Sequence, residues 1–167
     1  FDKELGDNGR GHKLLGACYF GPTYQIHVDF SLASNAERFR FTLAHELRHL
    51  SLHRKLKLEF ESLDATARAI LDGDEDLMPR RRKLQTPRNF LEWQANSYAA
   101  ALLMPRATFG DELRKQQTAM GITRNVGVVW LTDGSGSQAE LEETVRRLSG
   151  IYETSRTATR IRLEELR

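Results

Sequence analysis

The sequence has little cysteine, little excess charge and no long apolar run. Its only cysteine, Cys18, excludes a disulfide within the chain, which fits a reducing cytosol. A formal net charge of +2 over 167 residues gives no argument for a nucleic acid or a membrane surface as partner. No apolar run approaches the roughly 20 residues of a membrane-spanning helix, and no signal peptide is visible. We therefore expect a cytoplasmic protein without a membrane contact.

The chain is long enough, and at 40% hydrophobic residues apolar enough, for one domain with a small appendage. Two apolar stretches around residues 14–20 and 23–30 flank the turn signal Gly21–Pro22 and predict a β-hairpin. Helical patterns follow, so the fold class is α+β. We expect a main domain at residues 1–118 and a strand and helical region at 119–167, packed on it and ending in a helix-turn-helix-like pair. In that pair Gly150 is expected to break the first helix, and Ser155 is expected to cap the second.

A helix is predicted from about residue 35 to about residue 53. Ser34 and Glu37 form a capping box at its start. An apolar stripe at helical spacing predicts that the helix is well buried; the stripe consists of Phe39, Leu43, Leu47 and Leu50.

This helix carries the sequence His45-Glu46-Leu47-Arg48-His49, an H-E-x-x-H match. Residues four apart lie about 6 Å apart on one helix face, so His45 and His49 can share one zinc ion at about 2.0–2.1 Å. Glu46 points about 100° around the helix, beside the metal but not in line to ligate it. There it can act as general base towards a water whose pKa the metal lowers. The alternative is a polar helix face with incidental histidines.

A catalytic zinc needs a third protein ligand, and the best candidate is Glu92 in a second predicted helix, residues 87–104. Alanines at positions 95, 99, 100 and 101 would let that helix approach the metal helix closely. Alternatively, Glu92 is a first-turn glutamate favoured by the helix dipole. His53 extends the histidine row by one turn and is too far along to share the ion. Zn²⁺ is the default, although Mn²⁺ or Fe²⁺ also suits two histidines and a glutamate.

The stretches RFTLAHELRHLSLH and EWQANSYAAALLMP, with the strand YQIHVD and the ending SRTATRIRLEEL, resemble the ImmA/IrrE family of gluzincin-like metallopeptidases. The resemblance implies a zincin-like core in the main domain at residues 1–118, in which a small sheet packs on the H-E-x-x-H helix and the Glu92 helix, followed by C-terminal helices. It implies that His45, His49 and Glu92 bind zinc and that Glu46 is the catalytic base. It also implies site-specific cleavage of a helix-turn-helix transcriptional repressor, which releases a stress or mobile-element response.

Two features depart from that family. Arg48 stands where the family usually has glycine, and its long side chain could narrow the cleft or alter partner contacts. The stretch GITRNVGVVWLTDGSGSQ, which contains a predicted short strand, has no counterpart that we can match.

Two charged segments have open interpretations. Residues 72–83, DGDEDLMPRRRK, predict a mobile solvated loop or a flap that contacts substrate. In the C-terminal helix, Arg156, Arg160 and Arg162 could face phosphates, but the neighbouring glutamates offset them and favour structural packing. Direct nucleic-acid binding is therefore not expected.

The sequence as a whole favours a cytosolic zinc endopeptidase with a protein substrate. One rival is a protease-fold binding module, an anti-repressor in which zinc is structural. An intact Glu46 argues against it, because a purely structural site has no use for a base. A DNA-binding regulator is a second rival, and the near-neutral charge argues against that.

Overall fold

The computed structural model describes residues 4–6, 13–20, 22–53, 87–124, 126–128 and 135–166. The chain forms two compact units, residues 1–99 and 100–167. The boundary between these units lies before the domain boundary predicted between residues 118 and 119, which stays a prediction about function. The described part is helix-rich with one small antiparallel sheet, which agrees with the α+β class.

The first unit begins with the predicted hairpin. Strand β1 (Gly16–Tyr19) pairs antiparallel with β2 (Gln25–Val28), and Gly16 lies opposite Val28. The second apolar stretch does not stay in the strand to its end, where Asp29 is buried and Phe30 is exposed. The chain turns there into a short 3₁₀ helix, Phe30–Ser34, for which Asp29 is the N-cap.

Asp29 is held by several donors. Its carboxylate accepts hydrogen bonds from the Leu5 amide and from the amide and hydroxyl of Ser31, and it pairs with Lys13 at 3.1 Å. Burial alone would raise the pKa of Asp29, but these hydrogen bonds lower it well below the usual range. Asp29 therefore ties the segment before β1 to the end of β2.

Helix α1 (Ala36–Arg48) begins one residue later than the capping box predicted. Its N-cap is Asn35, whose side chain accepts a hydrogen bond from the Arg38 amide. The prediction of Ser34 as the cap was wrong because Ser34 is still part of the preceding 3₁₀ turn. A π-helical turn, His49–His53, ends the helix. Such wider turns are common at functional sites.

The predicted apolar stripe of α1 is buried only in part, because Phe39 packs against the core of Leu15 and Leu32 while two of the leucines do not. Leu43 and Leu47 are each 39% exposed. The interior side of the helix instead carries polar residues and one alanine, namely Thr42, Ala44, His45, Glu46 and His49. The prediction was incomplete because it assigned the buried face of α1 by hydrophobicity. The helix also buries its candidate metal ligands, His45 and His49, and its candidate base, Glu46.

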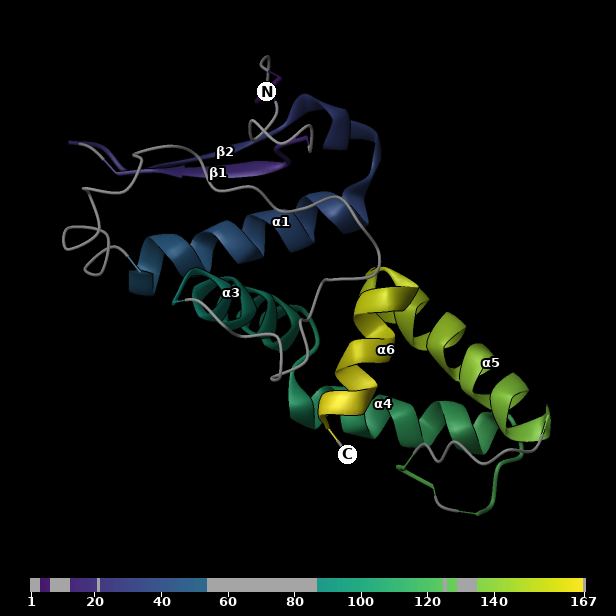
Figure 1. Cartoon of the computed structure of the whole chain (residues 1–167). Coiled ribbons are helices and arrows are strands. Elements are labelled where there is room, and N and C mark those ends of the chain that lie inside the picture. The colour runs from purple at the N-terminus through teal and green to yellow at the C-terminus, as the bar shows by residue number, and fades with distance from the viewer. Residues whose placement is uncertain are drawn as a thin grey trace. The chain divides into compact units, whose positions relative to one another are not determined.

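Helix α3 (Pro87–Leu103) begins at a proline, which suits the first position of a helix. In the first unit α1 lies between the hairpin on one side and the α3 segment on the other (Figure 1). Ala95 and Ala99 have no exposed surface, as expected if small residues allow close helix packing. The Arg48 guanidinium of α1 lies 5.2 Å from the ring centre of Tyr98 on α3.

The second unit consists of the end of α3 and three further helices. They are α4 (Arg106–Ala119), α5 (Ser135–Tyr152) and α6 (Arg156–Glu165). Ser155 caps α6 as predicted and accepts from the Ala158 amide. The predicted break of α5 at Gly150 was wrong, because the helix continues through it to Tyr152.

Two of the arginines of α6 make contacts within the second unit. Arg162 is 8% exposed, and its Nε donates to the carbonyl oxygen of Met104 at 3.0 Å. Arg160 pairs with Glu142 of α5. Neither guanidinium is thus available as an unpaired cation for phosphates.

Some predictions concern residues that the structure does not describe. They are the mobile loop or flap at 72–83 and most of the short strand before α5. Within the described ranges, no helix combines the length and apolar character needed to cross a membrane.

Candidate metal centre

Helix α1 presents His45 and His49 on one face because they lie four residues apart. Each imidazole is only 1% exposed, and Glu46 between them in sequence has no exposed surface. Buried ionisable groups are costly unless they are paired or bind a metal. Their burial on one helix therefore calls for a partner.

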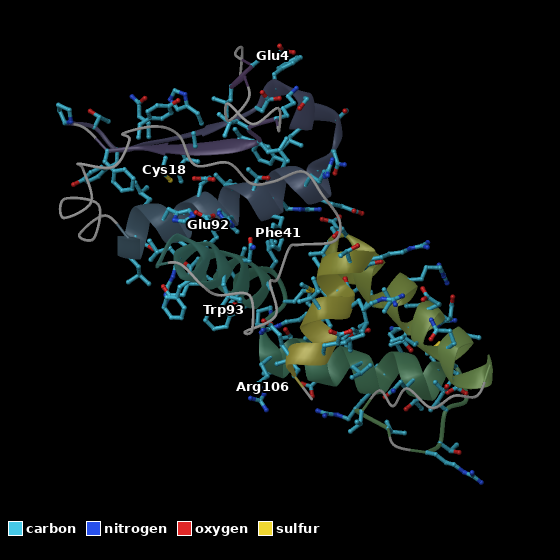
Figure 2. All side chains as sticks on the ribbon, viewed as in Figure 1. Glu4, Cys18, Phe41, Glu92, Trp93 and Arg106 are labelled. Carbon is cyan, nitrogen blue, oxygen red and sulfur yellow. The ribbon has the colours of Figure 1, made fainter. Side chains whose placement is uncertain are left out.

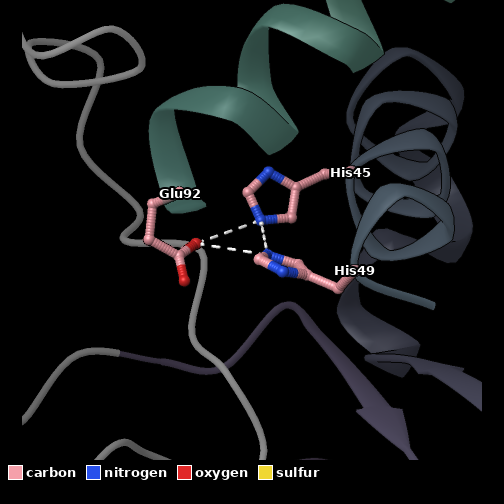
Figure 3. Close-up of side chains that lie close together, drawn as sticks. All are labelled: His45, His49 and Glu92. Carbon is pink, nitrogen blue, oxygen red and sulfur yellow. Dashed lines mark hydrogen bonds and ion pairs between the residues drawn. The ribbon is translucent and has the colours of Figure 1, made fainter. Parts of the chain in front are cut away.

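That partner is Glu92, at the start of α3. Its Oε2 lies 3.2 Å from Nε2 of His45 and 3.4 Å from Nε2 of His49, and the two Nε2 atoms are 2.9 Å apart (Figure 3). The ligand atoms of these residues all lie within 4.8 Å of one another. The structure therefore brings together the three residues that the sequence nominated, across 42 intervening positions in the case of His49 and Glu92.

The donor set fits a divalent cation. A tetrahedral zinc with ligands at about 2.0–2.1 Å separates neighbouring ligand atoms by about 3.3 Å. The three separations here bracket that value, since they are 2.9, 3.2 and 3.4 Å. The second carboxylate oxygen of Glu92, Oε1, is buried and has no hydrogen-bond partner among the described residues. An ion would therefore complete a contact that the protein leaves open.

The electrostatics of the cluster favour positive charge. Burial alone would lower the pKa of His45, but hydrogen bonding and attraction to Glu92, with a further contribution from Glu46, raise it. Burial alone would raise the pKa of Glu92, but hydrogen bonds from His45 and His49 lower it. The Glu92 side chain keeps 22% of its surface exposed, so the cluster lies near solvent on that side.

Asn96 is a further site residue that sequence reasoning missed. Its Oδ1 lies 2.7 Å from Nδ1 of His45, and the side chain is 8% exposed. An acceptor at Nδ1 favours the tautomer with hydrogen there, which leaves the Nε2 lone pair facing the cluster. The available signal was its spacing, because Asn96 follows Glu92 by four residues and shares its helix face.

Glu46 does not contribute to the ligand cluster and lies instead against strand β1. The side chain of Glu46 meets the backbone of Gly16, and the Cys18 thiol donates to the Glu46 carbonyl oxygen at 2.9 Å. Figure 2 shows Cys18 on the sheet side of α1. Cys18 is buried.

Arg48 is not one of the clustered ligands. The Arg48 guanidinium is directed towards Tyr98, so its replacement of the family's glycine adds a contact between α1 and α3. His53 ends the π-helical turn, and its side chain is outside the described residues.

One described cavity does not belong to this cluster. It measures about 900 Å³ and is lined in the second unit by residues of α4, α6 and the stretch 126–128, mostly apolar, among them Phe109, Leu113, Val128, Leu163 and Leu166. None of the clustered ligands lines it, and within the described ranges the only group of three potential metal ligands is His45, His49 and Glu92.

Comparison with known proteins adds one match. The sequence model of a peptidase family, M78, described as an IrrE N-terminal-like domain, matches residues 8–129. The match spans α1, α3 and α4, and so it includes every residue of the cluster. No curated protein and no solved structure matched the chain.

Proposed function

Because the chain belongs to the M78 peptidase family with an IrrE N-terminal-like domain, we propose that it is a zinc-dependent endopeptidase. A peptidase family implies a protein substrate. The observation that carries the proposal is the convergence of His45, His49 and Glu92 on one point beside a buried glutamate that is not among the ligands.

In this proposal His45, His49 and Glu92 hold the metal in a zincin-like core. Zn²⁺ is the favoured ion, with Mn²⁺ or Fe²⁺ as alternatives for the same donors. When bound, zinc would lower the pKa of a coordinated water and polarise the substrate carbonyl. Asn96 fixes the ring orientation of His45, and burial of both imidazoles keeps competing water away from their nitrogens.

Glu46 is the proposed general base. Its carboxylate accepts a proton from the attacking water and passes it to the amide nitrogen as the peptide bond breaks. Support comes from its position directly after His45 and from its attraction to that imidazole, which shows that the carboxylate lies within electrostatic range of the cluster. A buried carboxylate with no role as a ligand has a reason to be there if it moves a proton.

The proposed substrate is a helix-turn-helix transcriptional repressor, cleaved in the cytoplasm to start a stress or mobile-element response. This part rests on the resemblance of the two motif helices to the ImmA/IrrE family. The same resemblance supports a catalytic region within residues 1–118 and an accessory role for residues 119–167.

The test compares zinc content and cleavage on the same samples. Zinc-loaded protein is incubated with candidate repressors from its genomic neighbourhood, and the products are identified by mass spectrometry. Glu46→Gln keeps the size of the side chain, so zinc content should stay at the wild-type level while cleavage falls about 10²–10⁴-fold. His45→Ala should lose both. Full biological effect from Glu46→Gln, together with loss in His45→Ala, would instead identify a binding module with structural zinc.

A further inference from the structure

Strand β1 approaches the side chain of the candidate base closely at Gly16. A Cβ atom at this position would lie 2.9 Å from both Cγ and Oε1 of Glu46, and 2.7 Å from Cγ2 of Thr42. Ordinary contacts between carbon atoms are about 3.5–4.0 Å. Any side chain at position 16 would therefore occupy space that the Glu46 side chain now fills.

The surroundings leave Glu46 little room to move away. Thr42 and Glu46 lie four residues apart on α1, both on the face that meets β1, and they are 2% and 0% exposed. The strand is fixed from its other side because Gly16 pairs with Val28 of β2. An added Cβ must thus either push the strand from the helix or turn the Glu46 carboxylate.

A second contact places the strand at the same residue. Cys18 follows Gly16 by two positions and so lies on the same face of β1, where its thiol donates to the carbonyl oxygen of Glu46. The strand therefore touches both the backbone and the side chain of Glu46. Gly16 is the position where the absence of a side chain decides how close that approach can be.

From this geometry we infer that Gly16 is a positioning residue for Glu46, one that admits the carboxylate to its catalytic position by having no Cβ. The inference rests on the proposed role of Glu46 as general base. Displacement of a reacting group by about 1 Å can cost on the order of 10²-fold in rate. Gly16→Ala should accordingly lower kcat by about 10- to 100-fold while KM and zinc content stay near wild type.

The first experiment needs no substrate. Thermal unfolding of the full chain is measured for Gly16→Ala in five backgrounds: wild type, Glu46→Gln, Glu46→Ala, Thr42→Ser and Glu46→Ala with Thr42→Ser, each with zinc and with chelator. The midpoint should fall in the wild-type and Glu46→Gln backgrounds, because glutamine has the size of glutamate. The fall should shrink with Glu46→Ala and nearly vanish with both changes. An equal fall in all five backgrounds overturns the inference.

If Gly16→Ala alone does not fold, the same series still decides the matter. Recovery of folded protein when Glu46→Ala and Thr42→Ser are added supports the steric contact, and failure to recover refutes it. Gly150→Ala is the matched control, since a Cβ there meets nothing within 4 Å, and it should leave the rate unchanged and the midpoint no lower.

The second experiment measures kcat, KM and zinc content for Gly16→Ala with and without Thr42→Ser. The double variant should keep a low kcat, because relief at Thr42 does not remove the contact with Glu46. Recovery of kcat by Thr42→Ser would contradict positioning of the base and assign the defect to packing. If neither the wild type nor Glu46→Gln cleaves any candidate repressor, that result counts against the proposed function. The unfolding series still tests the contact between Gly16 and Glu46 on its own.

Discussion

Asn96 offers a sharp test of the candidate metal centre because its side chain contacts a proposed ligand without being a ligand itself. Its Oδ1 lies 2.7 Å from Nδ1 of His45, on the side of the ring away from the clustered Nε2 atom. Asn96→Ala removes that acceptor and leaves the three proposed ligands in place. Asn96→Asp keeps an acceptor oxygen at nearly the same position and is the matched control.

The expected loss can be sized from the role of such contacts. A hydrogen bond to the far nitrogen of a ligating histidine fixes its tautomer and orientation, and its removal typically weakens metal binding about 10- to 100-fold. That range corresponds to about 1.4–2.8 kcal/mol of binding free energy. Asn96 is 8% exposed, so water is poorly placed to substitute for the lost acceptor. We therefore expect the upper half of the range for Asn96→Ala.

The assay is competition for Zn²⁺ against a chromophoric chelator at fixed pH, with thermal unfolding as a check that each variant is folded. Asn96→Asp should bind zinc at least as tightly as wild type, because its carboxylate strengthens the bond to Nδ1. The reasoning is refuted if folded Asn96→Ala binds zinc with the wild-type affinity. It is also refuted if Asn96→Asp loses as much affinity as Asn96→Ala.

Three further predictions follow from other contacts. Glu92→Gln should abolish stoichiometric zinc binding in equilibrium dialysis, since it removes the only anionic ligand of the cluster. Asp29→Asn should lower the free energy of unfolding at pH 7 by about 2 kcal/mol in urea titrations. Because the folded pKa of Asp29 is lowered, the wild type loses this stability progressively as pH falls from about 4 towards the folded pKa, and the difference between the two proteins should narrow over that range. Arg162→Met should cost about 1–3 kcal/mol by leaving the Met104 carbonyl without its donor, measured in the same titrations.

The sequence predicted the parts of this structure that depend on local spacing. The pair His45 and His49 follows from helical periodicity, and Ser155 follows from capping chemistry. The meeting of Glu92 with that pair depends on how two helices pack, which the alanines of α3 and the family resemblance indicated but which spacing alone does not determine. The role of Gly16 could not be predicted, because the sequence around a strand glycine does not show whether that glycine faces solvent or a carboxylate.

The error in the predicted buried face of α1 has a physical cause. The predicted interior stripe of α1 included Leu43 and Leu47, which are partly exposed, while polar side chains take the interior. Hydrophobic patterning assumes that burial is selected for stability alone, and it fails where burial serves chemistry. A helix α1 that buried all its leucines and exposed its histidines would follow the hydrophobic pattern better, but it would hold no buried cluster. The burial of polar residues in place of Leu43 and Leu47 is therefore itself an indication of function.

The charge balance of the cluster explains why α1 can bury these polar side chains. Glu46 and Glu92 bring two carboxylates to a site where two neutral imidazoles supply no compensating charge. Burying ions costs several kcal/mol each unless an opposite charge is close. Without a metal, proton uptake is the available compensation, and the pKa of His45 is accordingly raised despite its burial. One divalent cation held by His45, His49 and Glu92, as proposed, would balance both carboxylates and keep the proposed base Glu46 ionised. The two carboxylates that make the burial of this cluster costly would therefore favour a doubly charged ion there.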